Sequence, residues 1–130
     1  MKCKNKRCTR EAHKRHTLCV PCRYKMQKKK YPVKRAYFTL RSNAQRRGKE
    51  FTLTLADFTE FCNASGYIAR KGITSTSATV DRIDEERGYS VDNIQCLTNA
   101  ENRRKFAAYM RAKKQERSLA IKNISTNNLE

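Results

Sequence analysis

The chain has 130 residues, of which 38% are apolar and none is Trp. This length leaves room for one ordinary domain or two very small ones. So small an apolar fraction excludes a single large hydrophobic core and calls for additional stabilisation, such as a bound metal. Thirty Lys and Arg against twelve Asp and Glu give a net charge of +18, which indicates a polyanionic partner.

The positive charge is concentrated in the first part of the chain. Residues 1–50 carry 18 basic and 2 acidic side chains, whereas residues 51–130 carry 12 and 10. We expect nucleic acid as the partner; a membrane surface is the alternative, but it requires a segment with large apolar residues on one face. Because the sequence has no run of 18 apolar residues and no apolar signal-peptide core, we expect an intracellular, cytoplasmic protein with no membrane partner.

Four cysteines near the N-terminus form a C-x4-C-x10-C-x2-C pattern. Two short cysteine loops separated by a connector suit tetrahedral zinc, and the surrounding basic residues favour thiolates. Disulfides are the weaker alternative in a reducing compartment. We therefore predict a basic zinc module over residues 1–30, with a structural Zn²⁺ that has no open coordination position. Its ligands would be Cys3, Cys8, Cys19 and Cys22.

The other cysteines and both histidines receive a plainer interpretation. Cys62 and Cys96 are isolated, so we expect them to be small buried hydrophobic residues. His13 and His16 lie inside the connector and could replace a cysteine as zinc ligands. Since four thiolates already complete the site, we expect these histidines to be solvated or to contact phosphate.

A basic linker is expected over residues 24–35, with Pro32 interrupting it. Apolar residues then recur at helical spacing from Val33 to Ala44, and Gly48 suits the position just after the helix end. Five basic side chains surround this stripe without an acid, so we predict phosphate contact, with an ordinary solvated face as the alternative.

A second helix is predicted to follow a short extended piece. Thr54 and Asp57 have the spacing of a capping box, and the buried side of this helix would carry Leu55, Phe58, Phe61 and Cys62. Residues 63–77 are polar and predict a loop with a turn of strand at Tyr67 and Ile68.

The segment from residue 78 onward predicts the order strand, loop, strand, helix. Residues 78–84 alternate as a strand does, and residues 93–97 suit a second strand. Thr98 followed by Glu101 is a capping-box candidate that would open a helix at about Asn99. Along this helix, Asn102, Phe106, Tyr109 and Lys113 share one side, and the last 15 residues are expected to fray. The predicted fold class is α+β.

The sequence "VDRIDEERGYSVDNIQCLTNAENRRK" resembles the ββα-metal core of phage-type HNH (His-Me finger) endonucleases. "CKNKRCTREAHKRHTLCVPCRY" resembles the zinc knuckles of many phage nucleases, and "NAQRRGKEFTLTLADFTEFC" is similar to the segment that precedes their catalytic motif. Asp81 matches the first-strand metal ligand and Asn102 the helical one. Asn93 matches the Asn that ties the loop together, and Lys105 closes the Asn-x-x-Lys run.

The resemblance implies an endonuclease that cleaves double-stranded DNA with Mg²⁺ or Mn²⁺ in a phage-infected bacterial cell. Its catalytic residues would be Asp81, Arg82, Asn93 and Asn102, with Asp81 and Asn102 as ligands of the hard cation. Arg82 is a departure, because the family has a His base there and Arg stays protonated. Arg82 could clamp the scissile phosphate, leaving Asp84 or solvent to accept the proton.

A second departure concerns zinc. Some relatives hold the core with C-x2-C pairs, which are missing here, so we expect no second zinc. The predicted organisation is a zinc module (1–30), a basic helical DNA-contacting region (31–62), an HNH-like core (63–115) and a tail (116–130). The residues expected to contact DNA are Lys28, Lys29, Lys30, Lys34, Arg35, Arg41, Arg46, Arg47, Arg103, Arg104 and Lys105.

Two other functions fit the same residues. Loss of the His base favours a catalytically degenerate HNH frame that serves as a DNA-binding regulator or structural protein. A basic zinc module also suits RNA binding or ribosome association. Among these features, only the motif at residues 78–105 favours DNA cleavage in particular.

Overall fold

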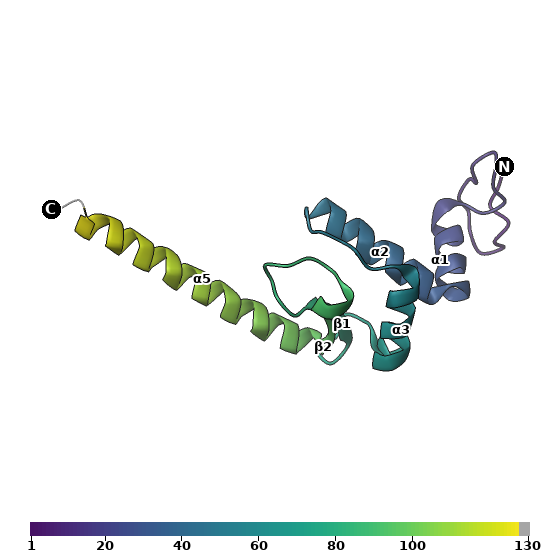
Figure 1. Cartoon of the computed structure of the whole chain (residues 1–130). Coiled ribbons are helices and arrows are strands. Elements are labelled where there is room, and N and C mark those ends of the chain that lie inside the picture. Colours follow the sequence, from purple (N-terminus) through teal and green to yellow (C-terminus); the bar gives the residue numbers. More distant parts are fainter. Residues whose placement is uncertain (128–130) are drawn as a thin grey trace.

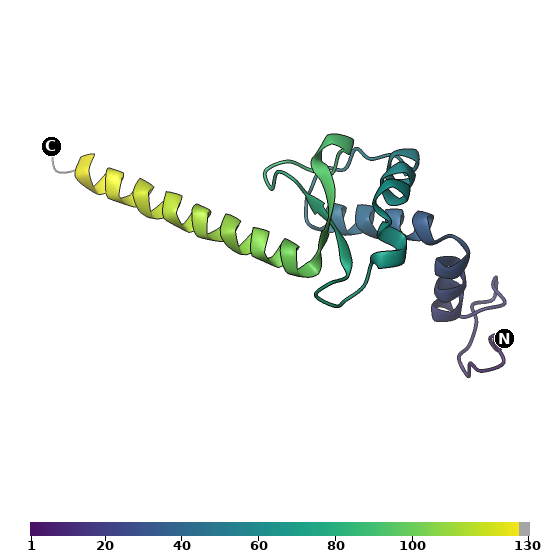
Figure 2. The ribbon, with the colours of Figure 1, turned by 90° about the horizontal axis from the view of Figure 1, so that it is seen from below.

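The computed structural model describes residues 1–127 of the chain. The molecule is elongated, with the cysteine-rich loop at one end and a long helix projecting from the other (Figure 1), and a view from below shows the same arrangement (Figure 2). Helices surround one small antiparallel sheet, so the α+β prediction is confirmed. The elements are α1 (Val20–Lys30), α2 (Pro32–Arg46), α3 (Leu55–Ser65), α4 (Tyr67–Arg70), β1 (Ala78–Arg82), the 3-10 turn η1 (Val91–Asn93), β2 (Ile94–Thr98) and α5 (Asn99–Asn127).

The linker expected over residues 24–35 is wrong, because helices occupy nearly all of it. α1 runs to Lys30, and Pro32 is the first residue of α2. Lys, Gln and Met favour helices, and Pro is tolerated in a first turn because its missing N–H would have no helical partner there. Arg35 of α2 stacks on Tyr24 of α1, with its guanidinium carbon 4.5 Å from the ring centroid. This contact ties the N-terminal cysteine module (residues 1–30) to the rest of the molecule.

The two predicted helix boundaries in the middle of the chain are confirmed. Gly48 follows the end of α2 with φ 67°, a left-handed conformation that a glycine adopts without strain. At the start of α3, the backbone N–H of Asp57 donates to Thr54 Oγ1 (3.1 Å), and the Thr54 N–H donates to Asp57 Oδ2 (3.1 Å). These two bonds form the capping box.

The hydrophobic core joins α2, α3 and the strands. Phe58 has no exposed surface and lies at its centre, with Tyr37, Val80 and Tyr89 in the same cluster. The Tyr37 hydroxyl donates to the Leu53 carbonyl (2.8 Å), so the ring's one polar atom is satisfied. Residues 31–62 and 63–115 therefore share one core and pack as a single unit.

The loop and strand turn expected over residues 63–77 are partly wrong. α3 continues to Ser65, Gly66 ends it at φ 67°, and Tyr67 and Ile68 lie in the short helix α4. Both side chains pack against the core, which holds this turn of helix in place. Propensity alone could not reveal that contact.

β1 and β2 pair in antiparallel fashion, with Asp81 opposite Gln95. α5 follows β2 directly, and Thr98 Oγ1 accepts the Glu101 backbone N–H (3.1 Å), which is one of the two bonds of the predicted capping box. The expected tail from residue 116 is wrong as far as Asn127, because α5 continues to that residue; residues 128–130 lie outside the described residues. None of the helices within residues 1–127 has the length and apolar character of a membrane span.

Candidate functional site

The four N-terminal cysteines come together, which confirms the predicted metal-binding cluster. The Sγ atoms of Cys3, Cys8, Cys19 and Cys22 all lie within 4.8 Å of one another. The Cys8 and Cys19 sulfurs are 3.6 Å apart, close to the edge of about 3.8 Å that a tetrahedral zinc–thiolate site requires. The donor set and spacing therefore fit a structural metal such as zinc.

Two of the four cysteine sulfurs accept hydrogen bonds from nearby N–H groups. The Cys19 backbone N–H donates to Cys3 Sγ (3.3 Å), and Asn5 Nδ2 donates to Cys22 Sγ (3.2 Å). The pKa of Cys3 is lowered to about 7 by the backbone donors of Cys19 and Asn5. The Asn5 bond also lowers the pKa of Cys22, but contact with neighbouring thiols and burial outweigh it and raise that pKa to about 11. Without a cation, Cys3 therefore loses its proton more readily than Cys22 does.

The remaining cysteines and the histidines stay outside this cluster. His13 and His16 are exposed, with ring centroids 6.2 Å apart. Cys62 is buried as expected, and burial raises its pKa to about 11, which suits an unreactive thiol. Cys96 is half-buried, so it meets the expectation only in part.

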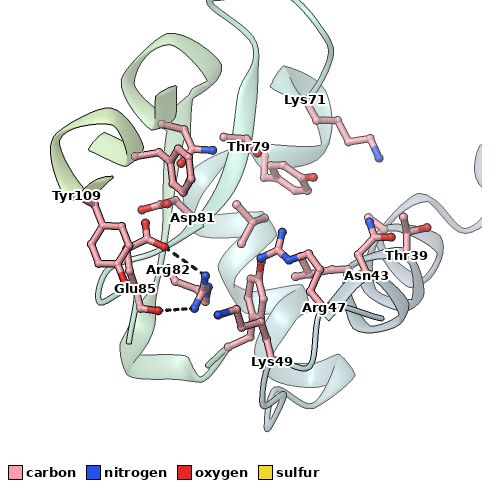
Figure 3. A pocket seen from close by; sticks show the side chains of 17 residues that line it. Thr39, Asn43, Arg47, Lys49, Lys71, Thr79, Asp81, Arg82, Glu85 and Tyr109 are labelled. Atoms are coloured by element: carbon pink, nitrogen blue, oxygen red, sulfur yellow. Dashed lines mark hydrogen bonds and ion pairs between the residues drawn. The ribbon is translucent and has the colours of Figure 1, made fainter. Parts of the chain in front are cut away.

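Three of the four predicted catalytic residues, Asp81, Arg82 and Asn102, line a cleft of about 630 Å³, whereas Asn93 lies outside the lining. β1 carries Asp81 on one wall, and the segment after α2 carries Arg47 and Lys49 on the other (Figure 3). Asn102 of α5 also lines the cleft. Lys71, at the end of α4, adds a third cation to the lining. The cleft therefore combines oxygen ligands with a cationic rim, a combination suited to a phosphate group.

Asp81 is buried in the wall of the cleft with only 6% of its surface exposed. Its Oδ2 accepts a hydrogen bond from Gln95 Nε2 (2.9 Å), the residue directly opposite on β2. The same oxygen lies 3.1 Å from the ammonium of Lys105. The strand register thus fixes the carboxylate, and α5 supplies its counter-charge.

Lys105 joins α5 to β1 and to the loop after it. Its Nζ donates to the Arg82 carbonyl (2.6 Å) and to Glu85 Oε1 (2.9 Å), besides contacting Asp81. Burial lowers the pKa of Lys105, but hydrogen bonds to Glu85 and Asp81 outweigh it, so the pKa is raised. Lys105 is therefore a half-buried counter-ion in the cleft wall, whereas the sequence predicted a DNA contact.

The Arg82 guanidinium holds the loop after β1. It donates to the carbonyls of Glu85 and Arg87 (2.8 Å each), pairs with Glu85 Oε2 (3.2 Å), and lies 5.6 Å from the Tyr89 ring centroid (Figure 3). With 8% of its surface exposed, Arg82 is bound by its own chain. Its predicted contact with a scissile phosphate stays a prediction.

Asn93 makes hydrogen bonds of the kind that the resemblance implied. Its Oδ1 accepts the Asp84 backbone N–H (2.8 Å), while its Nδ2 donates to the carbonyls of Gly88 (2.8 Å) and Asp84 (3.2 Å). Only 1% of the residue is exposed. The hydrogen bonds of Asn93 therefore hold the loop between Asp84 and Gly88 in place. The assignment of Asn93 to catalysis stays a prediction.

Asp81 and Asn102, the expected ligands of a hard cation, each keep a side-chain oxygen without a hydrogen-bond partner among residues 1–127. Within residues 1–127, the hydrogen bonds and ion pairs of Asp81 use Oδ2, which leaves Oδ1 available, and the Asn102 side chain makes no hydrogen bond. Both residues line the same cleft. Mg²⁺ takes one or two protein oxygens together with substrate phosphate and water, and the binding of such an ion by Asp81 and Asn102 stays a prediction.

The sequence did not identify several residues of this site. Glu85 lines the cleft and binds both Arg82 and Lys105, whereas Asp84 is exposed and outside the lining. Residues 84–86 are three successive acids, and the sequence does not indicate which of them points into the cleft, because the fold of the turn decides this. Lys49 and Lys71 were also missed, since they come from segments far from the motif.

The predicted DNA-contacting residues lie at different depths. Arg35 is half-buried against Tyr24 and Lys105 is half-buried in the cleft wall, so both have structural contacts. The others are exposed on three helices and remain accessible to a polyanion; they are Lys28, Lys29, Lys30, Lys34, Arg41, Arg46, Arg47, Arg103 and Arg104. Comparison with protein-family models, with curated proteins and with solved structures finds no match for this chain.

Proposed function

We propose that this chain is a DNA-binding, divalent-metal-dependent endonuclease with an HNH-like ββα core and a structural zinc module. The observation that carries the proposal is the cleft, in which Asp81 and Asn102 face the cationic side chains Arg47 and Lys49. The net charge of +18 supports a polyanionic substrate. Strand, loop, strand and helix also follow in the order typical of that nuclease core.

Each part of the cleft has a task in phosphodiester hydrolysis. Arg47, Lys49 and Lys71 bind the phosphate backbone, and the bonds from Gln95 and Lys105 orient Asp81. A Mg²⁺ or Mn²⁺ ion held by Asp81 and Asn102 would stabilise the negative charge that develops on the scissile phosphate. Arg82 and Asn93 act indirectly, because they hold the loop that carries Glu85.

The proton of the attacking water needs an acceptor other than histidine. Both histidines of the chain are in the cysteine module, outside the lining of the cleft. Among the described residues that line the cleft, Glu85 is the only carboxylate besides Asp81. Because the two oxygens of Glu85 pair with Arg82 and Lys105, and Asp84 lies outside the lining, we assign solvent as the acceptor of this proton.

Cleavage of supercoiled plasmid in a series of divalent metals tests the proposal. Wild type should nick or cut with Mg²⁺ or Mn²⁺, and Asp81→Asn should lower the rate on the order of 10²–10³-fold, because the anionic ligand of the cation that stabilises the transition-state charge is lost. Asp92→Asn removes the same charge from an exposed loop position and is the matched control. Equal behaviour of wild type and Asp81→Asn in every metal would overturn the proposal.

A second candidate is a catalytically degenerate HNH frame that binds DNA. The engagement of the Arg82 guanidinium by the loop carbonyls favours it, because Arg82 accepts no proton and is held by its own chain. Arg82→His separates the two: gain of cleavage in the variant would indicate a disabled site, and loss of cleavage an active site that needs Arg82. Competition between duplex DNA and structured RNA tests the RNA-binding alternative.

A further inference from the structure

The distal half of α5 has no packing partner within the described chain. Tyr109 and Lys113 contact Glu86 at 2.8 and 2.9 Å, and beyond them every residue to Asn127 is exposed. At 1.5 Å per residue, the segment 114–127 extends about 21 Å from the core, and the projection is plain in both ribbon views (Figure 1 and Figure 2). A helix of this kind receives little stability from tertiary contacts.

The basic side chains of α5 are sorted between two faces. Lys105 and Lys113 point to the acids of the loop, where they form ion pairs with Asp81, Glu85 and Glu86. At about 100° per residue, the other six fall within an arc of about 140° on the opposite face. We call these six the basic stripe: Arg103, Arg104, Arg111, Lys114, Arg117 and Lys122.

No acid balances the basic stripe. The acids of α5, Glu101 and Glu116, fall outside its arc, and no member of the stripe takes part in an ion pair within residues 1–127. Arg111, Lys114 and Arg117 succeed one another at i,i+3 spacing, so their like charges repel along the helix. The stripe thus weakens an unsupported helix, and a bound polyanion would relieve that repulsion.

We propose that the basic stripe lies along duplex DNA and contacts its phosphates over nearly one helical turn beyond the cleft. From Arg103 to Lys122 the stripe is about 28 Å long, compared with about 34 Å for a turn of DNA. An α-helix of about 10–12 Å diameter fits the major groove of B-DNA, whereas the deep, narrow groove of A-form RNA excludes it. The choice of DNA rests on the proposed function.

A second copy of the chain fits this face less well. A helix pair needs a continuous apolar seam at spacings of three and four residues. Between Met110 and Ile121, the positions at that spacing are Lys113 and Arg117. Two cations in the middle of the seam disfavour self-association, and the same charges attract phosphate.

The test compares two full-length variants with wild type. In the first, Arg111, Lys114, Arg117 and Lys122 are replaced by Gln, which keeps the helix propensity. The second carries the same four changes together with Ala112→Lys, Leu119→Lys, Asn123→Lys and Thr126→Lys. The four added lysines restore the net charge of wild type but place it away from the basic stripe. Circular dichroism confirms that both variants keep the helix before binding is measured.

Fluorescence anisotropy with a duplex DNA over a salt series gives the decisive quantity. Each phosphate that the protein no longer neutralises lowers the slope of log K against log salt by about 0.9, so the first variant should lose about 3 to 4 from the wild-type slope. The second variant should lose a similar amount, because its charges face away from the DNA. Hydroxyl-radical footprints of both variants should be shorter than that of wild type by about half a turn, because Arg103 and Arg104 remain and the segment 111–122 is about 17 Å long.

Several outcomes would overturn the inference. An unchanged slope in the first variant would show that the stripe makes no phosphate contacts. Recovery of the wild-type slope in the second would show that net charge alone matters, and tighter binding to an A-form RNA duplex would exclude DNA as the preferred partner. These readouts need no cleavage. They are therefore independent of the Asp81→Asn experiment, which tests the endonuclease itself.

Discussion

The cysteine module and the core that follows it reach an ordered structure by different means. Within residues 1–19 the buried residues are Cys3, Ala12 and Cys19, and no aromatic ring lies among them. The core instead packs aromatic side chains around Phe58, with Tyr37 and Tyr89 in the same cluster. The cysteine module therefore has candidate metal ligands but no hydrophobic core, whereas the region that follows it has a hydrophobic core.

This difference assigns a separate source of stability to each region. Burial of apolar surface stabilises the core whether or not a cation is present. In the cysteine module, the free energy of metal binding is the free energy of folding, because little apolar surface is available. The two regions should therefore respond independently to changes that target one of them.

Removal of the metal should have the largest effect and should be confined to the cysteine module. Structural zinc in such modules contributes about 10–16 kcal/mol, so a strong chelator, or Cys19→Ser, should unfold this region. Hydrogen exchange should show loss of protection around Cys3 and Cys19, while α2, α3 and the strands keep theirs. Simultaneous loss of protection in both regions would contradict the separation.

Phe58→Ala should have the next largest effect and should be confined to the core. Truncating a fully buried Phe costs about 3–5 kcal/mol, since it leaves a cavity among the remaining aromatic rings. Urea unfolding of the core measures the change, and Phe38→Ala, at an exposed position, is the matched control. Metal content should stay at the wild-type level, and its loss in Phe58→Ala would show that the core also organises the cysteine module.

Acid should produce the smallest effect, through the capping box of α3. The bond from the Thr54 backbone N–H, followed by that of the Thr54 hydroxyl, holds the pKa of Asp57 below its ordinary value of 3.8. A lowered pKa means that this stabilisation is fully present above about pH 4 and is lost as the pH falls through the lowered pKa. Asp57→Asn should therefore flatten the acid limb of the core's stability curve.

Glu60→Gln is the control for that measurement, because it removes the same charge from an exposed position on α3. It should leave the acid limb unchanged. Thr54→Ala should cost about 1 kcal/mol at neutral pH, as expected for loss of an N-cap. Equal acid limbs in Asp57→Asn and wild type would show that another carboxylate governs the acid response of the core.

Local chemistry was enough to predict much of this structure. The cysteine spacing predicted the cluster, the capping residues predicted the start of α3, and Gly48 predicted the end of α2. The pattern of apolar residues placed β1 and β2, and the capping candidate Thr98 placed the start of α5. These features depend on residues close together in the chain, so the sequence by itself determined them.

The tertiary structure alone decided which polar groups meet. Lys105 and Glu85 are distant in sequence from each other, and only the packing of α5 on the strands brings their charges to 2.9 Å. The inward turn of Arg82 depends on the loop carbonyls that Asn93 holds in place. Electrostatic and hydrogen-bonding energies depend on distances between atoms, and for distant residues those distances exist only after the chain has folded.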